Sequence, residues 1–236
     1  MNHQALAIID TEKCFMPLEE GLRLDNPEGF GELGVPGGEK VVGPINELTE
    51  TFVRAGLPIV TTQEAHPQET AHFATDEAPN YVNTWPVHGV AGTAGAELHP
   101  ELLVEQQPSL ATRFIKGDAS IATPEEDSSY TGALAHQPET GQLLPANLRE
   151  QGVETVYVVG LAIGDGNEHK LCVDSTAVDL KQQGFDVVVV TDATEAVLPE
   201  NRQKCFKNLG KLGIRLLLTA EARAEIEAAH TLEQGA

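Results

Sequence analysis

A pattern that occurs four times along this chain limits what it can fold into: an amphipathic helical stretch, then a glycine, then a run of apolar and β-branched residues. A glycine at the end of a helix adopts the left-handed conformation that turns the chain toward a following strand. The runs are apolar almost throughout, which is typical of strands covered by helices on both faces. The predicted helices cover 38–55, 145–151, 172–183 and 199–209, and they end at Gly56, Gly152, Gly184 and near Gly210 and Gly213.

These units predict an α/β fold with three layers, α/β/α, around a mostly parallel, doubly wound sheet of about six strands. The predicted strands are 5–10, 57–62, 113–117, 153–160, 185–190 and 214–218. The length of 236 residues and the lack of a repeat or linker favour one domain, 1–236. Ligands bind outside the carboxyl ends of such strands, where the sequence has Asp10, residues 63–66, Lys116 and the segment after Gly160. The long irregular stretches 17–36, 66–110 and 118–144 are predicted to be functional loops.

The formal charge of −21, from 36 acidic and 15 basic residues, argues against a nucleic-acid partner and is typical of a highly soluble surface. Apolar stretches such as 187–190 are too short to span a membrane, and the first ten residues do not resemble a signal peptide. Three cysteines without a CxxC pair favour a reducing cytoplasm. We therefore expect a cytoplasmic protein whose partner is a small molecule, and a homo-oligomer is compatible with the sequence.

Two charged residues end predicted strands. A carboxylate at Asp10, after an otherwise apolar strand, can carry a raised pKa and act as a base, although a helix-capping role is at least as common for such a residue. Lys116 ends the short strand 113–117 and could hold that carboxylate, whereas a single lysine is usually a solvated surface residue.

A group of histidines follows the second predicted strand. Glu64 and His66 alternate along an extended segment, so they project to the same side and can share a metal ion. His72 and His88 could complete a nitrogen- and oxygen-rich site that suits zinc, manganese or iron. For any one histidine a surface or core role is the more common one. No comparable setting exists for His3, His99, His136, His169 and His230.

Cys172 opens a predicted helix directly after a strand and a glycine-rich turn. A thiol at a helix N-terminus is expected to ionise more easily, and backbone N–H groups there can stabilise an oxyanion. The alternative is a buried, inert cysteine, which is the better interpretation of Cys14 and Cys205. The segment 160–167 lacks the G-x-G-x-x-G order, so nucleotide binding is not expected.

Together these residues resemble the nicotinamidase/pyrazinamidase family of the cysteine hydrolase, or isochorismatase-like, superfamily. The matching segments are 7–15, 61–73, 83–102, 113–118 and 171–180. The resemblance implies hydrolysis of nicotinamide to nicotinate and ammonia through a thioester, as a step of NAD salvage.

The resemblance also implies a role for each site residue. The catalytic triad would be Asp10, Lys116 and Cys172, and backbone groups of Ala162 and Cys172 would form the oxyanion hole. One divalent metal, zinc in preference to manganese or iron, would be held by Glu64, His66, His72 and His88. A pyridine ring would lie between Phe15 and Trp85, with Tyr130 in the pocket wall; ordinary core packing is the alternative for the first two.

The chain departs from the family pattern near the nucleophile. Nine residues, 163–171, separate Gly160-Leu161-Ala162 from Cys172, where the family usually has three. That turn normally carries a cis peptide and an oxyanion donor, so the insert puts the Ala162 donor in question. The insert could bulge outward or reshape access, and it favours one alternative, an amidase for another small cyclic or carbamoyl amide. A second alternative is a catalytically idle ligand-binding relative, and the intact set of Asp10, Lys116 and Cys172 counts against it. Three single-residue departures are Glu12 for Gln, Glu64 for Asp and Gly89 for Cys, and Asp165 or Glu168 could replace an acidic residue usually found two before the cysteine.

Overall fold

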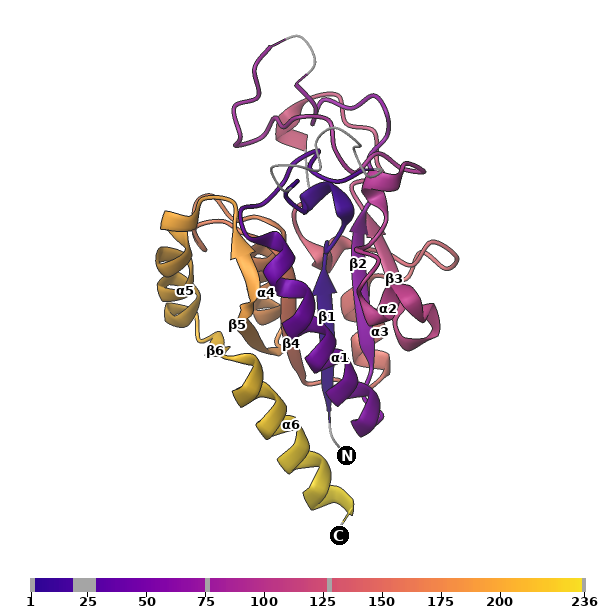
Figure 1. The fold of residues 1–236 in the computed structure, drawn as a ribbon, viewed down its shortest axis with the longest axis vertical. Helices are drawn as coiled ribbons and strands as arrows, with labels where there is room; N and C mark the ends of the chain where they lie inside the picture. Colours follow the sequence, from indigo (N-terminus) through magenta and orange to yellow (C-terminus); the bar gives the residue numbers. More distant parts are fainter. Residues whose placement is uncertain (1–2, 19–28, 75–76, 127–128, 235–236) are drawn as a thin grey trace.

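A computed structural model describes residues 3–18, 29–74, 77–126 and 129–234, and its centre is a six-stranded sheet (Figure 1). Every strand pair in it is parallel, in the order β3-β2-β1-β4-β5-β6. The strands are β1 Gln4–Ile9, β2 Ile59–Glu64, β3 Thr112–Lys116, β4 Thr155–Ile163, β5 Asp186–Ala196 and β6 Arg215–Leu217. The predicted doubly wound sheet is confirmed, and it is parallel throughout.

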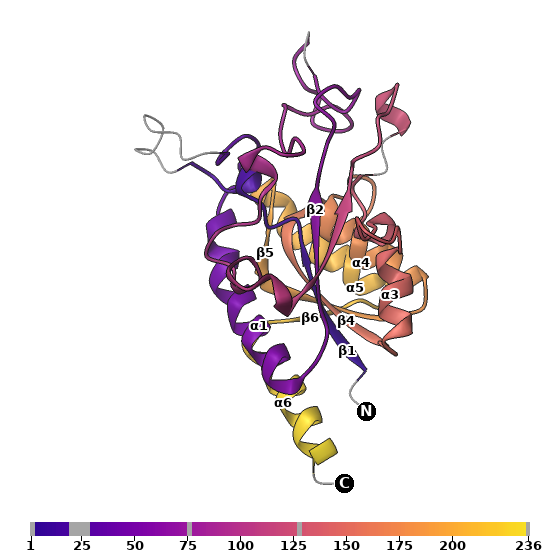
Figure 2. The same cartoon turned by 90° about the vertical axis from the view of Figure 1, so that its right-hand side faces the viewer.

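Helices cover both faces of this sheet (Figure 2). They are α1 Val42–Ala55, α2 Leu103–Gln106, α3 Leu144–Glu150, α4 Cys172–Gln182, α5 Arg202–Lys211 and α6 Thr219–Gln234. Helices α1 and α6 lie together on one face, and α3, α4 and α5 lie on the other. The three-layer prediction is confirmed, whereas α2 and α6 were not expected from the sequence.

Strand β1 shows why the core divides into two apolar clusters. Leu6 and Ile8 pack with α1 and α6, while Ala7 and Ile9 face the cluster that contains α4 and α5. Successive side chains of a strand point to opposite faces of the sheet, so an uninterrupted apolar strand contributes to both clusters. Its burial between two helical layers fixes β1 at the centre of the molecule.

The strand order reverses at the boundary between β1 and β4. The chain builds β1, β2 and β3 toward one edge, then returns to place β4 on the other side of β1. The ends of β1 and β4 therefore diverge into loops on opposite faces, which leaves a crevice typical of ligand sites in such sheets. Asp10 directly follows β1 and Cys172 begins α4 after β4, so both lie at this boundary.

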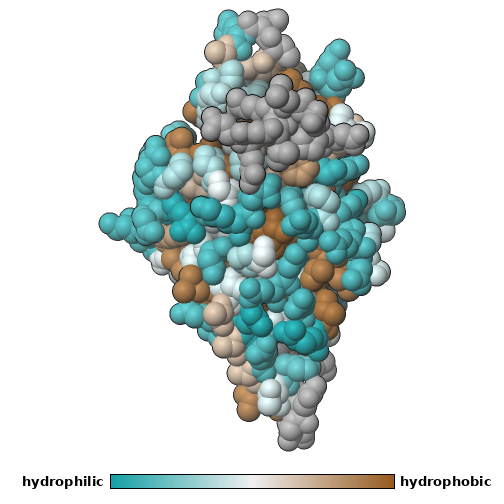
Figure 3. All heavy atoms as spheres, viewed as in Figure 1, coloured by the Kyte–Doolittle hydropathy of each residue, from teal (hydrophilic) through white to brown (hydrophobic). Residues whose placement is uncertain are grey.

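The exterior is mainly hydrophilic on the face drawn in Figure 3, with apolar residues scattered among polar ones. This agrees with the formal charge of −21. In the part of the chain that the structure describes, no helix has the length and apolar character needed to cross a bilayer.

Candidate active site

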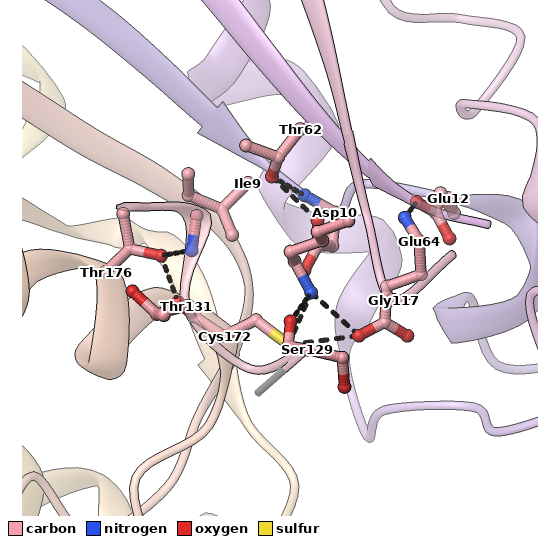
Figure 4. Close-up of polar contacts among 12 residues, drawn as sticks. Ile9, Asp10, Glu12, Thr62, Glu64, Gly117, Ser129, Thr131, Cys172 and Thr176 are labelled. Atoms are coloured by element: carbon pink, nitrogen blue, oxygen red, sulfur yellow. Dashed lines mark hydrogen bonds and ion pairs between the residues drawn. The ribbon is translucent and has the colours of Figure 1, made fainter. Parts of the chain in front are cut away.

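Asp10, Lys116 and Cys172 meet at the carboxyl edge of the sheet (Figure 4). The Lys116 ammonium lies 2.8 Å from Asp10 Oδ2 and 3.6 Å from Cys172 Sγ. It also donates a hydrogen bond to the backbone carbonyl of Ser129. Thr62 fixes the carboxylate by donating from its hydroxyl to Asp10 Oδ1 at 2.7 Å. The structure thus brings together the three residues that the sequence put forward as catalytic.

Glu64 connects this group to the histidines. Its Oε1 lies 2.7 Å from the Lys116 ammonium and 3.7 Å from Cys172 Sγ. Its Oε2 lies 3.2 Å from His66 Nε2 and 3.3 Å from His88 Nε2. Sequence reasoning assigned Glu64 to the metal alone. The contact with Lys116 was missed because it depends on strand register, which pairs the last residues of β2 and β3.

The charges of the three central residues depend on one another. Burial raises the pKa of Asp10, and the neighbouring Lys116 only partly offsets this. Burial acts against the charge of Lys116, but the carboxylates of Asp10 and Glu64, together with the nearby sulfur of Cys172, hold its pKa well above the ordinary value. A protonated lysine beside a carboxylate of increased basicity is the arrangement that general base catalysis needs.

The expectation of an easily ionised nucleophile is wrong. Burial raises the pKa of the Cys172 thiol well above its ordinary value; Lys116 opposes this, and the carboxylates of Asp10 and Glu64 add to it. Burial and two nearby carboxylates disfavour the thiolate, in opposition to the helix N-terminus, which favours it. The nucleophile therefore rests as a neutral thiol and needs a base to remove its proton.

Glu12 is a second buried carboxyl group in contact with Glu64, whose backbone N–H donates to it. Burial, followed by repulsion from Asp10 and Glu64, raises the pKa of Glu12 well above its ordinary value. Glu64 has the opposite balance: burial would raise its pKa, but Lys116 and His66 hold it well below the ordinary value. The sequence identified Glu12 as a departure from the family pattern, but it did not predict where the Glu12 side chain lies in the site.

The ring nitrogens of His66, His72 and His88 lie within 4.8 Å of one another, all buried. The Nδ1 atoms of His66 and His88 face the backbone carbonyls of Gly117 and Pro86, at 3.1 and 2.7 Å. A carbonyl in this position fixes the proton on Nδ1 and leaves the Nε2 lone pair for a metal. Three histidines with the adjacent Glu64 carboxylate form a donor set that suits zinc, so these residues fit a divalent metal.

A mainly apolar pocket opens beside the cysteine. Trp85 lies in its wall and donates from its indole nitrogen to the Tyr130 hydroxyl at 2.6 Å. The ring of Phe15 lies 5.5 Å from that of His88. The lining residues are Phe15, Leu33, Val35, Glu64, His72, Trp85, His88, Tyr130, Ala162, Leu171, Cys172 and Val197. The predicted substrate and oxyanion residues therefore all border one cavity.

The insert 163–171 folds back over the start of α4 and leaves Cys172 as the first residue of that helix. The peptide between Leu161 and Ala162 is cis, as the family pattern implies. The buried carboxylate of Asp174, in the first turn of α4, accepts hydrogen bonds from the backbone N–H groups of Gly164, Gly166 and Leu171 at 2.8 to 3.0 Å. Sequence reasoning missed Asp174, although an acidic residue three positions after the residue that precedes a helix is a capping signal.

Of the two acidic candidates within the insert, Asp165 is buried and structural. Its carboxylate accepts from the backbone N–H groups of Asn167 and His169 and lies 3.0 Å from the Lys204 ammonium. These contacts, with burial acting in the opposite direction, lower the pKa of Asp165 to about 2. Glu168 lies in an exposed part of the insert.

The other two cysteines fit inert roles. Both are buried free thiols, and burial is the largest cause that raises their pKa values. In Cys14 the raised pKa is reinforced by Glu12, and in Cys205 by Asp174. A protonated thiol is a poor nucleophile, so neither competes with Cys172 for the role.

Comparison with known proteins agrees with this geometry. Residues 131–221 match the Isochorismatase domain family. A nicotinamidase of Acinetobacter baylyi is 29% identical over 209 residues, which cover 83% of this chain and 83% of that protein. Among solved structures, a pyrazinamidase of Pyrococcus horikoshii in complex with zinc superposes with a TM-score of 0.70 at 28% identity, covering 92% of this chain and 99% of that one.

A third similar protein is PnC1 from L. infantum, solved in complex with nicotinate. It is 28% identical, with a TM-score of 0.70, over 93% of this chain and 94% of that one. These matches cover most of the chain, 83% of it for the nicotinamidase and 92% and 93% of it for the two solved structures. These similarities support the nicotinamidase/pyrazinamidase family of the isochorismatase-like superfamily as the family of this chain.

Proposed function

We propose that this amidohydrolase converts nicotinamide to nicotinate and ammonia, with Cys172 as its nucleophile. The observation that carries the proposal is the buried contact of the Lys116 ammonium with Asp10 and with the Cys172 sulfur, at the edge of a mainly apolar pocket. The nicotinamidase relatives and the nicotinate complex support this choice of substrate.

In the first half of the reaction Asp10 takes the proton of the Cys172 thiol, and the sulfur forms a bond to the carboxamide carbon. The raised pKa of Asp10 favours this transfer, and Lys116 balances the negative charge that moves between the two groups. Backbone N–H groups of Ala162 and Cys172 would hold the developing oxyanion, since both residues border the pocket. The C–N bond then breaks, and the protonated Asp10 returns its proton so that ammonia leaves.

In the second half, water hydrolyses the thioester. Asp10, again ionised, takes a proton from water as the oxygen bonds to the carbonyl carbon. The C–S bond breaks, Cys172 recovers its proton, and nicotinate is released. The overall change is amide plus water to acid plus ammonia, with no other reactant.

The residues that would hold a divalent metal are Glu64, His66, His72 and His88. A metal bound there would supply a positive charge beside the pocket and could act as a Lewis acid. Glu64 would share its two oxygens between this site and Lys116, which couples the metal site to the catalytic lysine. The structure of a zinc-bound relative supports zinc as the first candidate.

The proposed substrate implies a place in NAD salvage, and the sparse cysteines favour the cytoplasm; both stay predictions.

Ammonia release from nicotinamide tests the proposal most directly, because the result depends on both the substrate and the mechanism. Wild-type protein loaded with zinc should turn over, and Cys172→Ala should lose activity by at least about a thousandfold. Cys205→Ala, which removes a thiol that does not line the pocket, is the matched control.

Three results separate the parts of this proposal. Lack of turnover by zinc-loaded wild type would exclude nicotinamide as the substrate. Activity that survives in Cys172→Ala would exclude the nucleophile. A wild type that keeps full activity after its metal has been removed by a chelator would exclude a metal requirement.

A further inference from the structure

A second cavity, of about 340 Å³, lies next to the catalytic pocket. Its lining residues are Tyr81, Trp85, Ile163, Gly164, His169, Leu171, Val197, Leu198 and Asn201. Three of these, Trp85, Leu171 and Val197, also line the catalytic pocket. The two cavities are therefore adjacent, and these three side chains border both of them.

The insert before Cys172 builds one wall of this second cavity. Ile163, Gly164, His169 and Leu171 all come from it. The segment 163–171, which is longer than its counterpart in the family pattern, thus has a definite location: it lines space adjoining the substrate pocket.

This wall is held firmly in place. The insert closes on itself through a hydrogen bond from the Asp165 backbone N–H to the His169 carbonyl at 2.9 Å. The backbone around Gly164 is so tightly packed that a Cβ there would overlap the same carbonyl oxygen. The carboxylates of Asp174 and Asp165 satisfy five backbone N–H groups of the insert. A wall fixed in this way can discriminate between ligands by shape.

The lining has the chemistry of a site for an apolar group. Aliphatic side chains and two aromatic rings predominate, and the polar groups are an imidazole, a phenol and a carboxamide. None of the lining residues that the structure describes is a carboxylate, lysine or arginine. Burial of apolar surface would favour an uncharged hydrocarbon group here and would disfavour a charged one.

We propose that the second cavity is a subsite for an apolar substituent on the substrate ring, so that the enzyme accepts aromatic carboxamides larger than nicotinamide. The inference rests on the proposed function, because the carboxamide must still reach Cys172. The reaction is unchanged: the C–N bond is hydrolysed, water supplies the oxygen of the acid, and ammonia leaves. The new element is the class of substrate.

Kinetics on substituted amides test the subsite. The probes are nicotinamide and nicotinamides that carry a butyl group at ring carbon 5 or 6. Wild type should hydrolyse at least one butyl compound with a kcat/KM equal to or above that for nicotinamide. Leu198→Asp should lower that value about tenfold or more while it changes the value for nicotinamide less than about twofold, since Leu198 lines only the second cavity.

Leu198→Asp is chosen because it should fold. The residue is 52% exposed and precedes a short 3-10 helix, a position where aspartate is favoured. Leu212→Asp is the matched control, because Leu212 is 50% exposed and lines neither cavity. Equal effects of the two substitutions on the butyl compound would overturn the proposal. So would a wild type that hydrolyses nicotinamide but neither butyl compound.

A binding measurement separates failure of the subsite from failure of the proposed function. Trp85 is the sole tryptophan of the chain and borders both cavities, so its fluorescence reports on occupancy of either. In Cys172→Ala the better butyl compound should bind at least about tenfold more tightly than nicotinamide, and Leu198→Asp should remove the difference. If no amide is hydrolysed but this binding pattern holds, the proposed reaction fails and the subsite stands. If nicotinamide is hydrolysed and the pattern is absent, the subsite alone fails.

Discussion

Replacement of Asp174 by asparagine should destabilise the protein more at acidic than at neutral pH. The carboxylate is buried in the first turn of α4 and accepts three backbone N–H groups of the insert. Burial, partly offset by these hydrogen bonds, raises the pKa of Asp174 from 3.8 to about 6. A raised carboxyl pKa means that the folded state binds the proton more tightly than the unfolded state. Stability therefore falls as the pH rises from about 4 to about 6 and stays lower above that range.

The size of the effect follows from the pKa difference. Each pKa unit corresponds to about 1.4 kcal/mol, so the ionised carboxylate costs about 3 kcal/mol of folding free energy at neutral pH. About 2 kcal/mol of this cost develops as the pH rises from about 4.5 to about 7.5. Asparagine does not ionise, but it replaces one carboxylate oxygen by an NH2 group. That group cannot accept the hydrogen bond from the Gly166 N–H, which lowers the unfolding free energy by about 1 to 3 kcal/mol at any pH. The difference in unfolding free energy between wild type and Asp174→Asn should thus shrink by about 2 kcal/mol as the pH rises.

Urea unfolding of both proteins at the two pH values measures this difference directly. The many other carboxylates titrate alike in the two proteins and cancel in the comparison. Asp165→Asn is the matched control within the same insert, because the pKa of Asp165 is lowered to about 2. The stabilising contribution of the Asp165 carboxylate is lost only as the pH falls toward about 2. The effect of Asp165→Asn on the unfolding free energy should therefore be constant between about pH 4.5 and about pH 7.5. A destabilisation by Asp174→Asn that grows with pH would refute the reasoning.

Three further outcomes are expected. Lys116→Met should lower the unfolding free energy by about 3 to 5 kcal/mol, because it leaves the buried carboxylates of Asp10 and Glu64 without their cation. The added substitution Asp10→Asn should recover part of this loss, and a double variant no more stable than Lys116→Met would contradict the pairing. Glu64→Gln should weaken zinc binding at least about tenfold in a chelator competition monitored by metal content, and unchanged affinity would remove Glu64 from the ligand set. Gly164→Ala should lower the unfolding free energy by more than about 2 kcal/mol, whereas Gly43→Ala in α1, where nothing lies within 4 Å, should not lower it.

The fold could be predicted because the glycine punctuation and the apolar runs are local signals. Errors arose where a signal was weak or a backbone constraint was overlooked. The second strand begins at Ile59 instead of residue 57, because Pro58 has no N–H to donate to a sheet. Helix α6 was missed because its sequence follows no glycine and shows little periodicity; Ala222 and Ile226 supply its buried face.

The site could be predicted as a set of residues but not as a network. Asp10 and Lys116 follow from the rule that ligands gather at the carboxyl ends of parallel strands, and Cys172 follows from its position at the start of a helix. Their joint role came from the family resemblance. The Glu64 contact with Lys116 needs the register of β2 against β3, and the role of Asp174 needs the path of the insert. The protonated state of Cys172 needs the depth of burial and the positions of two carboxylates. These are long-range quantities that no local pattern encodes.

The order of the site residues along the chain has a consequence for biosynthesis. The four residues that would hold the metal lie between positions 64 and 88, whereas the nucleophile is 108 residues beyond Glu64. A ribosome therefore completes the ligand segment well before it adds the cysteine, and β1, which β2 needs as a neighbour, has been made by then. During translation the proposed metal ligands are therefore present before the proposed nucleophile, and Cys172 joins them only when α4 packs against the sheet.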